Sequence, residues 1–205
     1  MTKPVRGAEA ERHRNKMAKR KAVQDAEIAG KTAEKGLLIV HTGTGKGRST
    51  AAFGLALRVL GRGGRVGVVQ FIKGAWHTAE RDALAKFGEQ VAWHTMGEGF
   101  TWETQDRERD IAAAQRAWSK ARELLDDTGF ALVILDELNI ALRYDYLDLA
   151  DILAVLKARR PDLHVVVTGR NAKPELVAAA DLVTEMTLVK HHFAAGVKAQ
   201  PGIEF

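Results

Sequence analysis

Residues 37–50 decide the fold, and they read LLIVHTGTGKGRST. Four apolar residues run into a turn with three glycines, and a polar triplet then opens an amphipathic stretch. Glycines let backbone N–H groups turn inward around phosphate oxygens, and a following helix adds the positive end of its dipole. The stretch predicts a strand, a phosphate-binding loop and a helix. The residues expected to bind phosphate are Gly43, Thr44, Gly45, Lys46, Gly47, Arg48, Ser49 and Thr50.

This loop departs from the usual pattern G-x-x-x-x-G-K-[ST] at two positions. Thr42 stands in place of the first glycine, and Arg48 stands in place of the lysine. Arginine keeps the positive charge and adds a two-pronged donor, although it is bulkier than lysine. The hydroxyl of Ser49 is placed to bind Mg²⁺. A glycine-rich turn without a ligand is the simpler alternative, but the strand and helix on either side favour phosphate binding.

A second stretch, FALVILDE at residues 130–137, has the form of a Walker B strand. Asp136 or Glu137 would hold Mg²⁺ directly or through water and offset the charge of a triphosphate. Taken alone, the stretch fits an ordinary strand that ends in a polar turn. Together with the phosphate loop it favours a metal site formed by Ser49, Asp136 and Glu137.

Short β-branched runs alternate with longer amphipathic ones after residue 35. Strands are expected at 37–40, 66–71, 91–94, 131–135, 164–168 and 182–188. Helices are expected at 48–60, 78–87, 105–125, 147–159 and 174–180. The alternation predicts an α/β fold with a doubly wound, mainly parallel sheet flanked by helices, like that of P-loop NTPases of the RecA type. Ligands then belong at the carboxyl ends of the strands, and the strand order stays open.

The composition limits the remaining possibilities. The 205 residues suit one main domain, and the chain has no cysteine, so thiolate metal sites and disulfides are excluded. We expect a cytoplasmic protein without membrane spans. Residues 1–35 hold ten of the 31 basic residues and five of the 26 acidic ones, which accounts for the whole net charge of +5. We expect residues 1–35 to form a basic, helical arm and residues 36–205 to form the domain. Nucleic acid is an unlikely partner, because no basic stripe continues into the domain.

Several further strings resemble the ATP:corrinoid adenosyltransferase family, which includes cob(I)yrinic acid a,c-diamide adenosyltransferases. Besides residues 42–50 they are VVQFIKG at 68–74 with Trp76, GFTWET at 99–104, LDE at 135–137, VTGR at 167–170, VKHHF at 189–193, GVKAQ at 196–200 and GI at 202–203. The resemblance covers residues 36–205. Arg48 stands where this family often has lysine, which bears on phosphate affinity more than on the class of reaction.

The resemblance implies a reaction and its partners. The 5′-deoxyadenosyl group of ATP would move to the cobalt(I) of a corrinoid (cob(I)yrinic acid a,c-diamide, cobinamide or cobalamin), with release of triphosphate, in adenosylcobalamin biosynthesis. Cobalt(I) is itself the nucleophile, so the protein has to position C5′ and stabilise a polyanionic leaving group. The family further implies ATP that lies reversed in its loop, Mg²⁺ or Mn²⁺, a flavin or flavodoxin-type reductant, a homodimer, and an arm that covers the nucleotide.

The resemblance also assigns catalytic roles. Phe100 and Trp102 would exclude water and displace a lower axial ligand of cobalt(II), although their spacing alone fits two core aromatics. Arg48 and Glu137 would act at the triphosphate. Side chains expected to contact ligands at strand ends are Gln70, Lys73, Trp76 and Arg170. For Lys73 and Arg170, a solvated charge fits equally well.

His191 and His192 invite a metal interpretation, but no third ligand stands at a plausible spacing. We therefore expect packing or polar contacts from this pair.

Two other functions remain open at this point. A P-loop small-molecule kinase would release ADP rather than triphosphate, and it should carry an arginine-rich lid that we do not find. A RecA-like ATPase acting on nucleic acid would show steeply salt-dependent binding carried by the arm.

Overall fold

The computed structural model describes residues 5–72, 78–97 and 106–204. The chain divides into two compact units, Met1–Glu34 and Lys35–Phe205. The first unit consists mainly of one helix, α1 (Val5–Ala29), in which Lys21 pairs with Asp25 one turn later at 2.6 Å. No glycine interrupts this helix after Gly7, and Gly30 follows its end. The basic arm is therefore helical from Val5 to Ala29.

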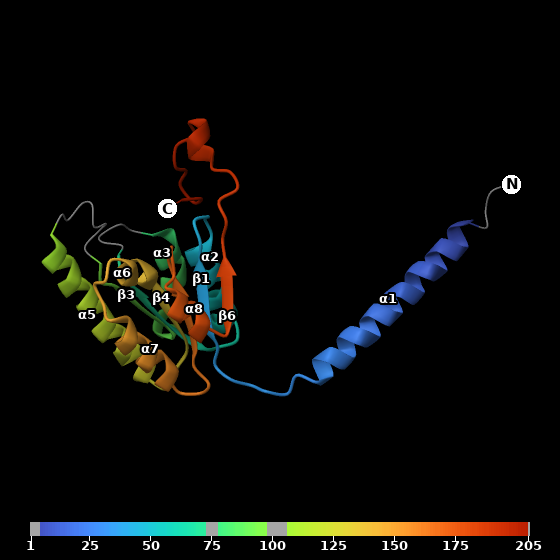
Figure 1. The fold of residues 1–205 in the computed structure, drawn as a ribbon, viewed down its shortest axis with the longest axis horizontal. Coiled ribbons are helices and arrows are strands. Elements are labelled where there is room, and N and C mark those ends of the chain that lie inside the picture. Colours follow the sequence, from blue (N-terminus) through green and yellow to red (C-terminus); the bar gives the residue numbers. More distant parts are fainter. Residues whose placement is uncertain (1–4, 73–77, 98–105, 205) are drawn as a thin grey trace. The chain divides into compact units, whose positions relative to one another are not determined.

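The second unit is built on one six-stranded sheet (Figure 1). Its strands are β1 (Leu38–Thr42), β2 (Arg65–Gln70), β3 (Val91–Thr95), β4 (Phe130–Asp136), β5 (His164–Thr168) and β6 (Leu182–Glu185). The order across the sheet is β3-β2-β4-β5-β1-β6, and all neighbouring strands are parallel. The fold class expected from the alternation of strands and helices is confirmed.

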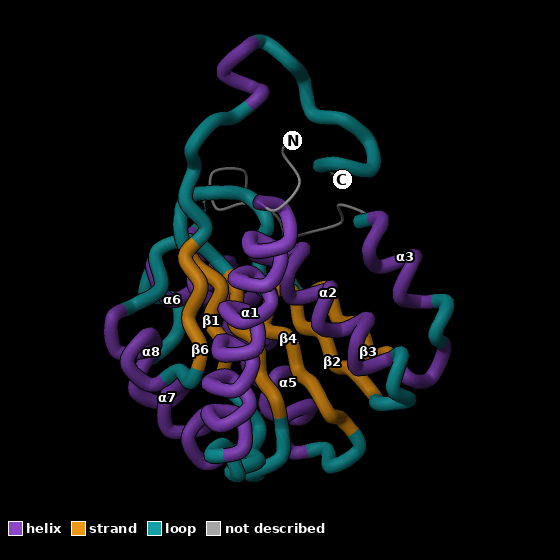
Figure 2. Tube along the Cα trace, turned by 90° about the vertical axis from the view of Figure 1, so that its right-hand side faces the viewer, coloured by secondary structure: helices purple, strands orange, loops and turns teal. Residues whose placement is uncertain are grey.

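Helices cover both faces of the sheet (Figure 2). They are α2 (Arg48–Leu60), α3 (Ala79–Ala85), α5 (Arg107–Asp126), α6 (Leu138–Arg143), α7 (Leu149–Ala158) and α8 (Pro174–Ala179), with short 3₁₀ turns at Gly88–Gln90 and His192–Ala195. Among the described residues, no helix combines the length and apolarity that a membrane span needs.

Alternation along the strands separates the two layers of the core. In β5, Val165 and Val167 pack into the cluster that contains residues of α5, α6, α7 and α8. Val166 points the other way, into the cluster formed with α2 and α3. Successive side chains of a strand face opposite sides, so a sheet buried on both faces needs continuous apolar runs. The valine run at 165–167 therefore contributes to both layers.

Among the described α-helices and strands, two differ from the expected ones by more than two residues at an end. Helix α6 was not predicted, because its six residues are too few to show a helical period and directly follow the acidic strand end. Strand β6 ends at Glu185 instead of residue 188. The reason is that β1, the strand with which β6 pairs, ends at Thr42 and turns into the glycine loop. The pairing of strands stops there, and Met186 bonds to Thr42 and to Gly45 of the loop instead.

The strand order brings distant parts of the sequence together. Strand β5 lies between β1 and β4, with His41 opposite Thr168 and Leu135 opposite Val167. Because all three strands run in the same direction, the segments that follow them meet at one edge of the sheet. These segments are the glycine loop, the Asp136-Glu137 turn and the Gly169–Asn171 turn.

Candidate active site

The glycine loop between β1 and α2 has the backbone that its sequence predicts. Gly43 has φ 96° and Gly47 has φ 105°, conformations that residues with a side chain rarely adopt. A Cβ at Gly43 would lie 2.4 Å from the carbonyl oxygen of Met186, and the Gly45 N–H donates to that same oxygen at 2.6 Å. The loop is thus pressed against the chain that follows β6, with no room for a side chain at Gly43 or Gly45.

Arg48, the first residue of α2, turns its guanidinium back into this loop. Its Nη1 donates to the carbonyl oxygens of Gly43, at 2.9 Å, and of Gly45, and its Nη2 lies 3.9 Å from Oε1 of Glu137. The side chain is 11% exposed. Burial lowers the pKa of Arg48, an effect that Glu137 opposes and the positive charge of Arg170 reinforces. A partly desolvated cation with a second cation nearby is an arrangement that an incoming anion stabilises.

Asp136, at the end of β4, is the centre of a buried hydrogen-bond network. It is 0% exposed. Its Oδ1 accepts from the hydroxyls of Ser49, at 2.7 Å, and Thr168, at 2.9 Å, and its Oδ2 accepts from Nε2 of Gln70 at 3.0 Å. The contact between Ser49 and Asp136 joins the phosphate loop to the acidic strand. It places two of the expected metal ligands next to each other.

Gln70 lies beneath the site. It is 1% exposed, and its Oε1 accepts from Nε1 of Trp93 and from the hydroxyl of Thr95, each at 3.1 Å. Its amide is therefore fixed at both ends, so Gln70 acts on the site through Asp136. The direct ligand contact expected for Gln70 stays a prediction.

Glu137 occupies a strained position at the start of α6. Its φ of 62° is left-handed, which is uncommon for a residue with a side chain, and its N–H donates to Oγ1 of Thr168 at 2.9 Å. Strain of this kind persists where the surrounding structure enforces it, often at functional sites. The turn directs the Glu137 carboxylate toward Arg48.

Sequence reasoning missed Thr168 as a site residue. Its hydroxyl donates to Asp136 and accepts from Glu137, so it connects both carboxylate residues to β5. The signal was available in the string VTGR, where a polar residue ends a buried valine run at a strand terminus.

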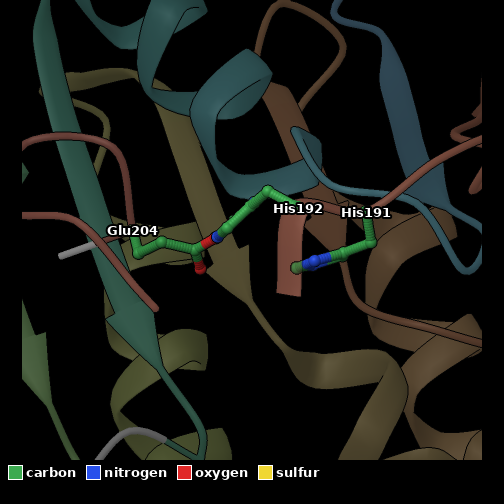
Figure 3. Close-up of side chains that lie close together, drawn as sticks. All are labelled: His191, His192 and Glu204. Carbon is green, nitrogen blue, oxygen red and sulfur yellow. The ribbon is translucent and has the colours of Figure 1, made fainter. Parts of the chain in front are cut away.

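Lys46 and Thr50 of the loop are exposed, and Lys46 pairs with Glu204 near the end of the chain. Glu204 also lies 3.4 Å from Nε2 of His192, and Figure 3 shows its carboxylate directed at that ring, with His191 beyond. Lys46 and the histidines lower the pKa of Glu204, Lys46 most strongly.

The structure corrects our statement that His191 and His192 lack a third ligand. Ligand atoms of His191, His192 and Glu204 lie within 4.8 Å of one another. The sequence hid this grouping because Glu204 follows the pair only after a 3₁₀ turn and a loop. The contacts observed are nevertheless polar and packing ones: Nδ1 of His191 accepts from the Phe193 N–H at 3.1 Å, and the two histidine rings stack with centroids 4.7 Å apart. Lys46 already supplies a cation to Glu204.

Four expected site residues lie outside the described residues: Lys73, Trp76, Phe100 and Trp102. Arg170 is described and exposed, between the loop that follows β1 and the turn that follows β4.

Comparison with known proteins matches the whole domain. The family model ATP:corrinoid adenosyltransferase BtuR/CobO/CobP matches residues 34–205, and the model Cob(I)alamin adenosyltransferase N terminal matches residues 7–28. A corrinoid adenosyltransferase of Pseudomonas aeruginosa is 57% identical over 195 residues, which are 95% of this chain and 96% of that protein. A corrinoid adenosyltransferase of Escherichia coli K12 is 45% identical over 195 residues, 95% of this chain and 98% of that protein.

Solved structures with some likeness include the flagellar accessory protein FlaH from Methanocaldococcus jannaschii. The likeness has a TM-score of 0.49 at 11% identity and covers 76% of this chain and 73% of that one. The sequence matches cover more of the chain, 95% against 76%, and at much higher identity. On their strength, the chain belongs to the ATP:corrinoid adenosyltransferase family BtuR/CobO/CobP.

Proposed function

We propose that this chain performs its family's reaction, transfer of the adenosyl group of ATP to the cobalt of a corrinoid, by gripping the triphosphate and leaving C5′ open to attack. The observation that carries the proposal is that Arg48 and the Ser49–Asp136 pair meet at one glycine loop, at the end of the sheet where the turn of Arg170 also lies. The arginines suit a polyanion, the Ser49–Asp136 pair suits a cation that would accompany it, and the chain has no cysteine to act as a nucleophile.

In the proposed step, the electron pair of cobalt(I) attacks C5′ of ATP. The cobalt–carbon bond forms while the C5′–oxygen bond breaks, and triphosphate leaves with the electron pair of that bond. The role of the protein is then to hold ATP in the reactive orientation and to stabilise charge on the leaving group. Arg48 already lies within the loop, and Lys46 stands exposed at its rim.

A divalent cation, Mg²⁺ or Mn²⁺, fits the oxygen atoms present. Hard cations of this kind prefer hydroxyl and carboxylate oxygens, and Ser49 and Asp136 supply both types 2.7 Å apart. Ser49 and Asp136 would hold the ion, with Glu137 acting directly or through water. When bound, the ion would offset part of the charge of the triphosphate.

Other features of the site belong to the same proposal. Phe100 and Trp102 would form the corrinoid side, and Lys73 and Trp76 would contact a ligand after β2. A flavin or flavodoxin-type reductant would supply electrons to cobalt. The arm, residues 1–35, would cover the nucleotide held by the domain, residues 36–205, and two chains would form a homodimer. The cytoplasmic location stays a prediction.

The decisive experiment is an anaerobic assay with ATP and a chemically reduced corrinoid. We expect formation of the cobalt–carbon bond, followed by absorbance, together with intact triphosphate as the second product. Arg48→Ala should lower kcat by about 10²–10³, the effect of removing one strong donor to a developing anion. Arg58→Ala, on the exposed end of the same helix, is the matched control and should behave as the native protein. Release of orthophosphate or ADP in place of triphosphate would refute the proposal.

The corrinoid side needs its own test. Phe100→Ala and Trp102→Ala should impair the reaction more for corrinoids that carry a lower axial ligand than for those without one. Equal losses with both kinds of corrinoid would reject the displacement role.

A further inference from the structure

The turn that carries Arg170 has an unusual backbone. It follows β5, and it contains Gly169 with φ 126° and Asn171 with φ 55°. Glycine and asparagine adopt positive φ more readily than other residues, so Gly169 and Asn171 let the chain turn sharply on both sides of Arg170. Three hydrogen bonds from neighbouring elements fix where this turn lies.

Two of these contacts come from the end of β1, next to the phosphate loop. The Gly169 N–H donates to the carbonyl oxygen of His41 at 3.2 Å, and the Ala172 N–H donates to Oγ1 of Thr42 at 3.0 Å. They bind the turn to the strand that leads directly into the loop. Movement of the turn is thereby coupled to the loop on one side.

The third contact comes from α6, on the other side of the turn. Nδ2 of Asn139 donates to the carbonyl oxygen of Gly169 at 3.0 Å. Gly169 is also enclosed there, since a Cβ at this position would lie 2.8 Å from Cβ of Asn139 and 3.0 Å from Oε2 of Glu137. The Gly169 peptide is thus clamped between the end of β1 and the start of α6.

Asn139 is a polar residue in a fully buried position. It is 0% exposed, and its Oδ1 finds no hydrogen-bond partner among the described residues. Burial of an unpaired carbonyl oxygen lowers stability, and an apolar side chain of the same size would avoid that loss. The side-chain amide of Asn139 makes one hydrogen bond, from Nδ2 to the carbonyl oxygen of Gly169. A leucine at this position would fill the same space but could not make that bond.

We propose that Asn139 is a positioning residue for triphosphate recognition, which holds the Gly169–Asn171 turn so that the guanidinium of Arg170 stands beside Arg48 and the phosphate loop. The inference rests on the proposed function, in which Arg170 binds the triphosphate. Because β5 lies between β1 and β4, the turn that carries Arg170 lies at the same end of the sheet as the phosphate loop that carries Arg48. Asn139 itself touches neither ATP nor corrinoid.

A double-mutant cycle tests the inference, with inorganic tripolyphosphate as the probe and calorimetry as the measurement. Asn139→Leu keeps the volume of the side chain and removes the donor. We expect it to weaken tripolyphosphate binding about tenfold in the native background and less than about twofold in an Arg170→Ala background, as for residues that act through one network. Equal losses in the two backgrounds, or native affinity in Asn139→Leu, would overturn the inference.

Two further variants separate positioning from a general loss of stability. Gln90→Met removes a comparable amide-to-carbonyl bond, from Gln90 to Gly64 at 3.2 Å, in the turn before β2, and should leave tripolyphosphate affinity unchanged. Thr42→Val removes the neighbouring contact to Ala172 without touching Asn139, and should show the same dependence on Arg170. An additive effect of Thr42→Val would also count against the inference.

The inference and the proposed function fail in different ways. If triphosphate is not a product, the proposed function is wrong whatever the binding cycle shows. If triphosphate is a product and Arg170→Ala weakens tripolyphosphate binding, but Asn139→Leu is not coupled to it, only the positioning role is wrong.

Discussion

The network around Asp136 allows a sharp test, because each of its hydrogen bonds has a defined direction. Asp136 accepts from Ser49, Thr168 and Gln70, while Oε1 of Gln70 accepts from Trp93 and Thr95. Asp136→Asn turns one acceptor into a donor, which then faces Nε2 of Gln70 at 3.0 Å. If Gln70 flips its amide to accept from the new donor, its N–H₂ group faces Trp93 and Thr95 instead.

The loss of stability in Asp136→Asn follows from the number of buried donors that lose their acceptor. While the amide oxygen of the new asparagine faces the hydroxyls of Ser49 and Thr168, one buried donor is left without an acceptor in either orientation of Gln70, which costs about 1–3 kcal/mol of unfolding free energy. For a chain of this length that corresponds to a melting temperature lower by about 2–12 °C. Gln70→Glu alone should also destabilise, since it sets a second buried carboxylate against Asp136.

The double variant Asp136→Asn with Gln70→Glu should recover most of the lost stability. The new carboxylate at position 70 can accept from Asn at 136 with one oxygen and from Trp93 and Thr95 with the other. Activity should stay reduced by at least about tenfold, because the carboxylate next to Ser49 is gone. The assay is equilibrium unfolding in denaturant for the native protein, both single variants and the double variant, with kcat measured in parallel. A double variant no more stable than Asp136→Asn alone would refute the hydrogen-bond directions described here.

Three further predictions concern other parts of the domain. Burial, with a smaller contribution from the charge of Lys120, lowers the pKa of His94. Below about pH 6.5, His94 is therefore protonated more fully in the unfolded chain than in the folded one. The free energy of unfolding should therefore fall as the pH drops below about 6.5. His94→Gln should make the difference in unfolding free energy between about pH 7 and about pH 5.5 smaller. An unchanged difference would contradict the effect of burial. Glu204→Gln should release Lys46 and tighten ATP binding by no more than about fivefold, and the gain should be smaller at high salt. Weaker ATP binding in this variant would instead show that Glu204 orients Lys46 for ATP. Asp106→Ala removes the cap of α5, where the side chain accepts from the Arg109 N–H at 3.1 Å, and should cost about 1 kcal/mol of unfolding free energy without changing kcat; a drop in kcat at full stability would point to a role in the site.

The sequence alone predicted the parts of this protein that depend on neighbours in the chain. The class of sheet follows from apolar runs such as 165–167, whose side chains face both layers. The phosphate loop follows from glycines at positions where the backbone is left-handed or tightly packed, as at Gly43. Helix α6 escaped prediction because six residues after a strained Glu137 show no period of their own.

The tertiary structure decided everything that depends on which strands are neighbours. Placing β5 between β1 and β4 brought Thr168 to Asp136, and Gly169 to Asn139, across about 30 residues of chain. It also brought Glu204 to Lys46 and His192. Local patterns of polarity and size govern which element a segment forms, but they do not record its distant partners. The hydrogen bonds that aim the carboxylates and arginines of the site arise only when the strands assemble.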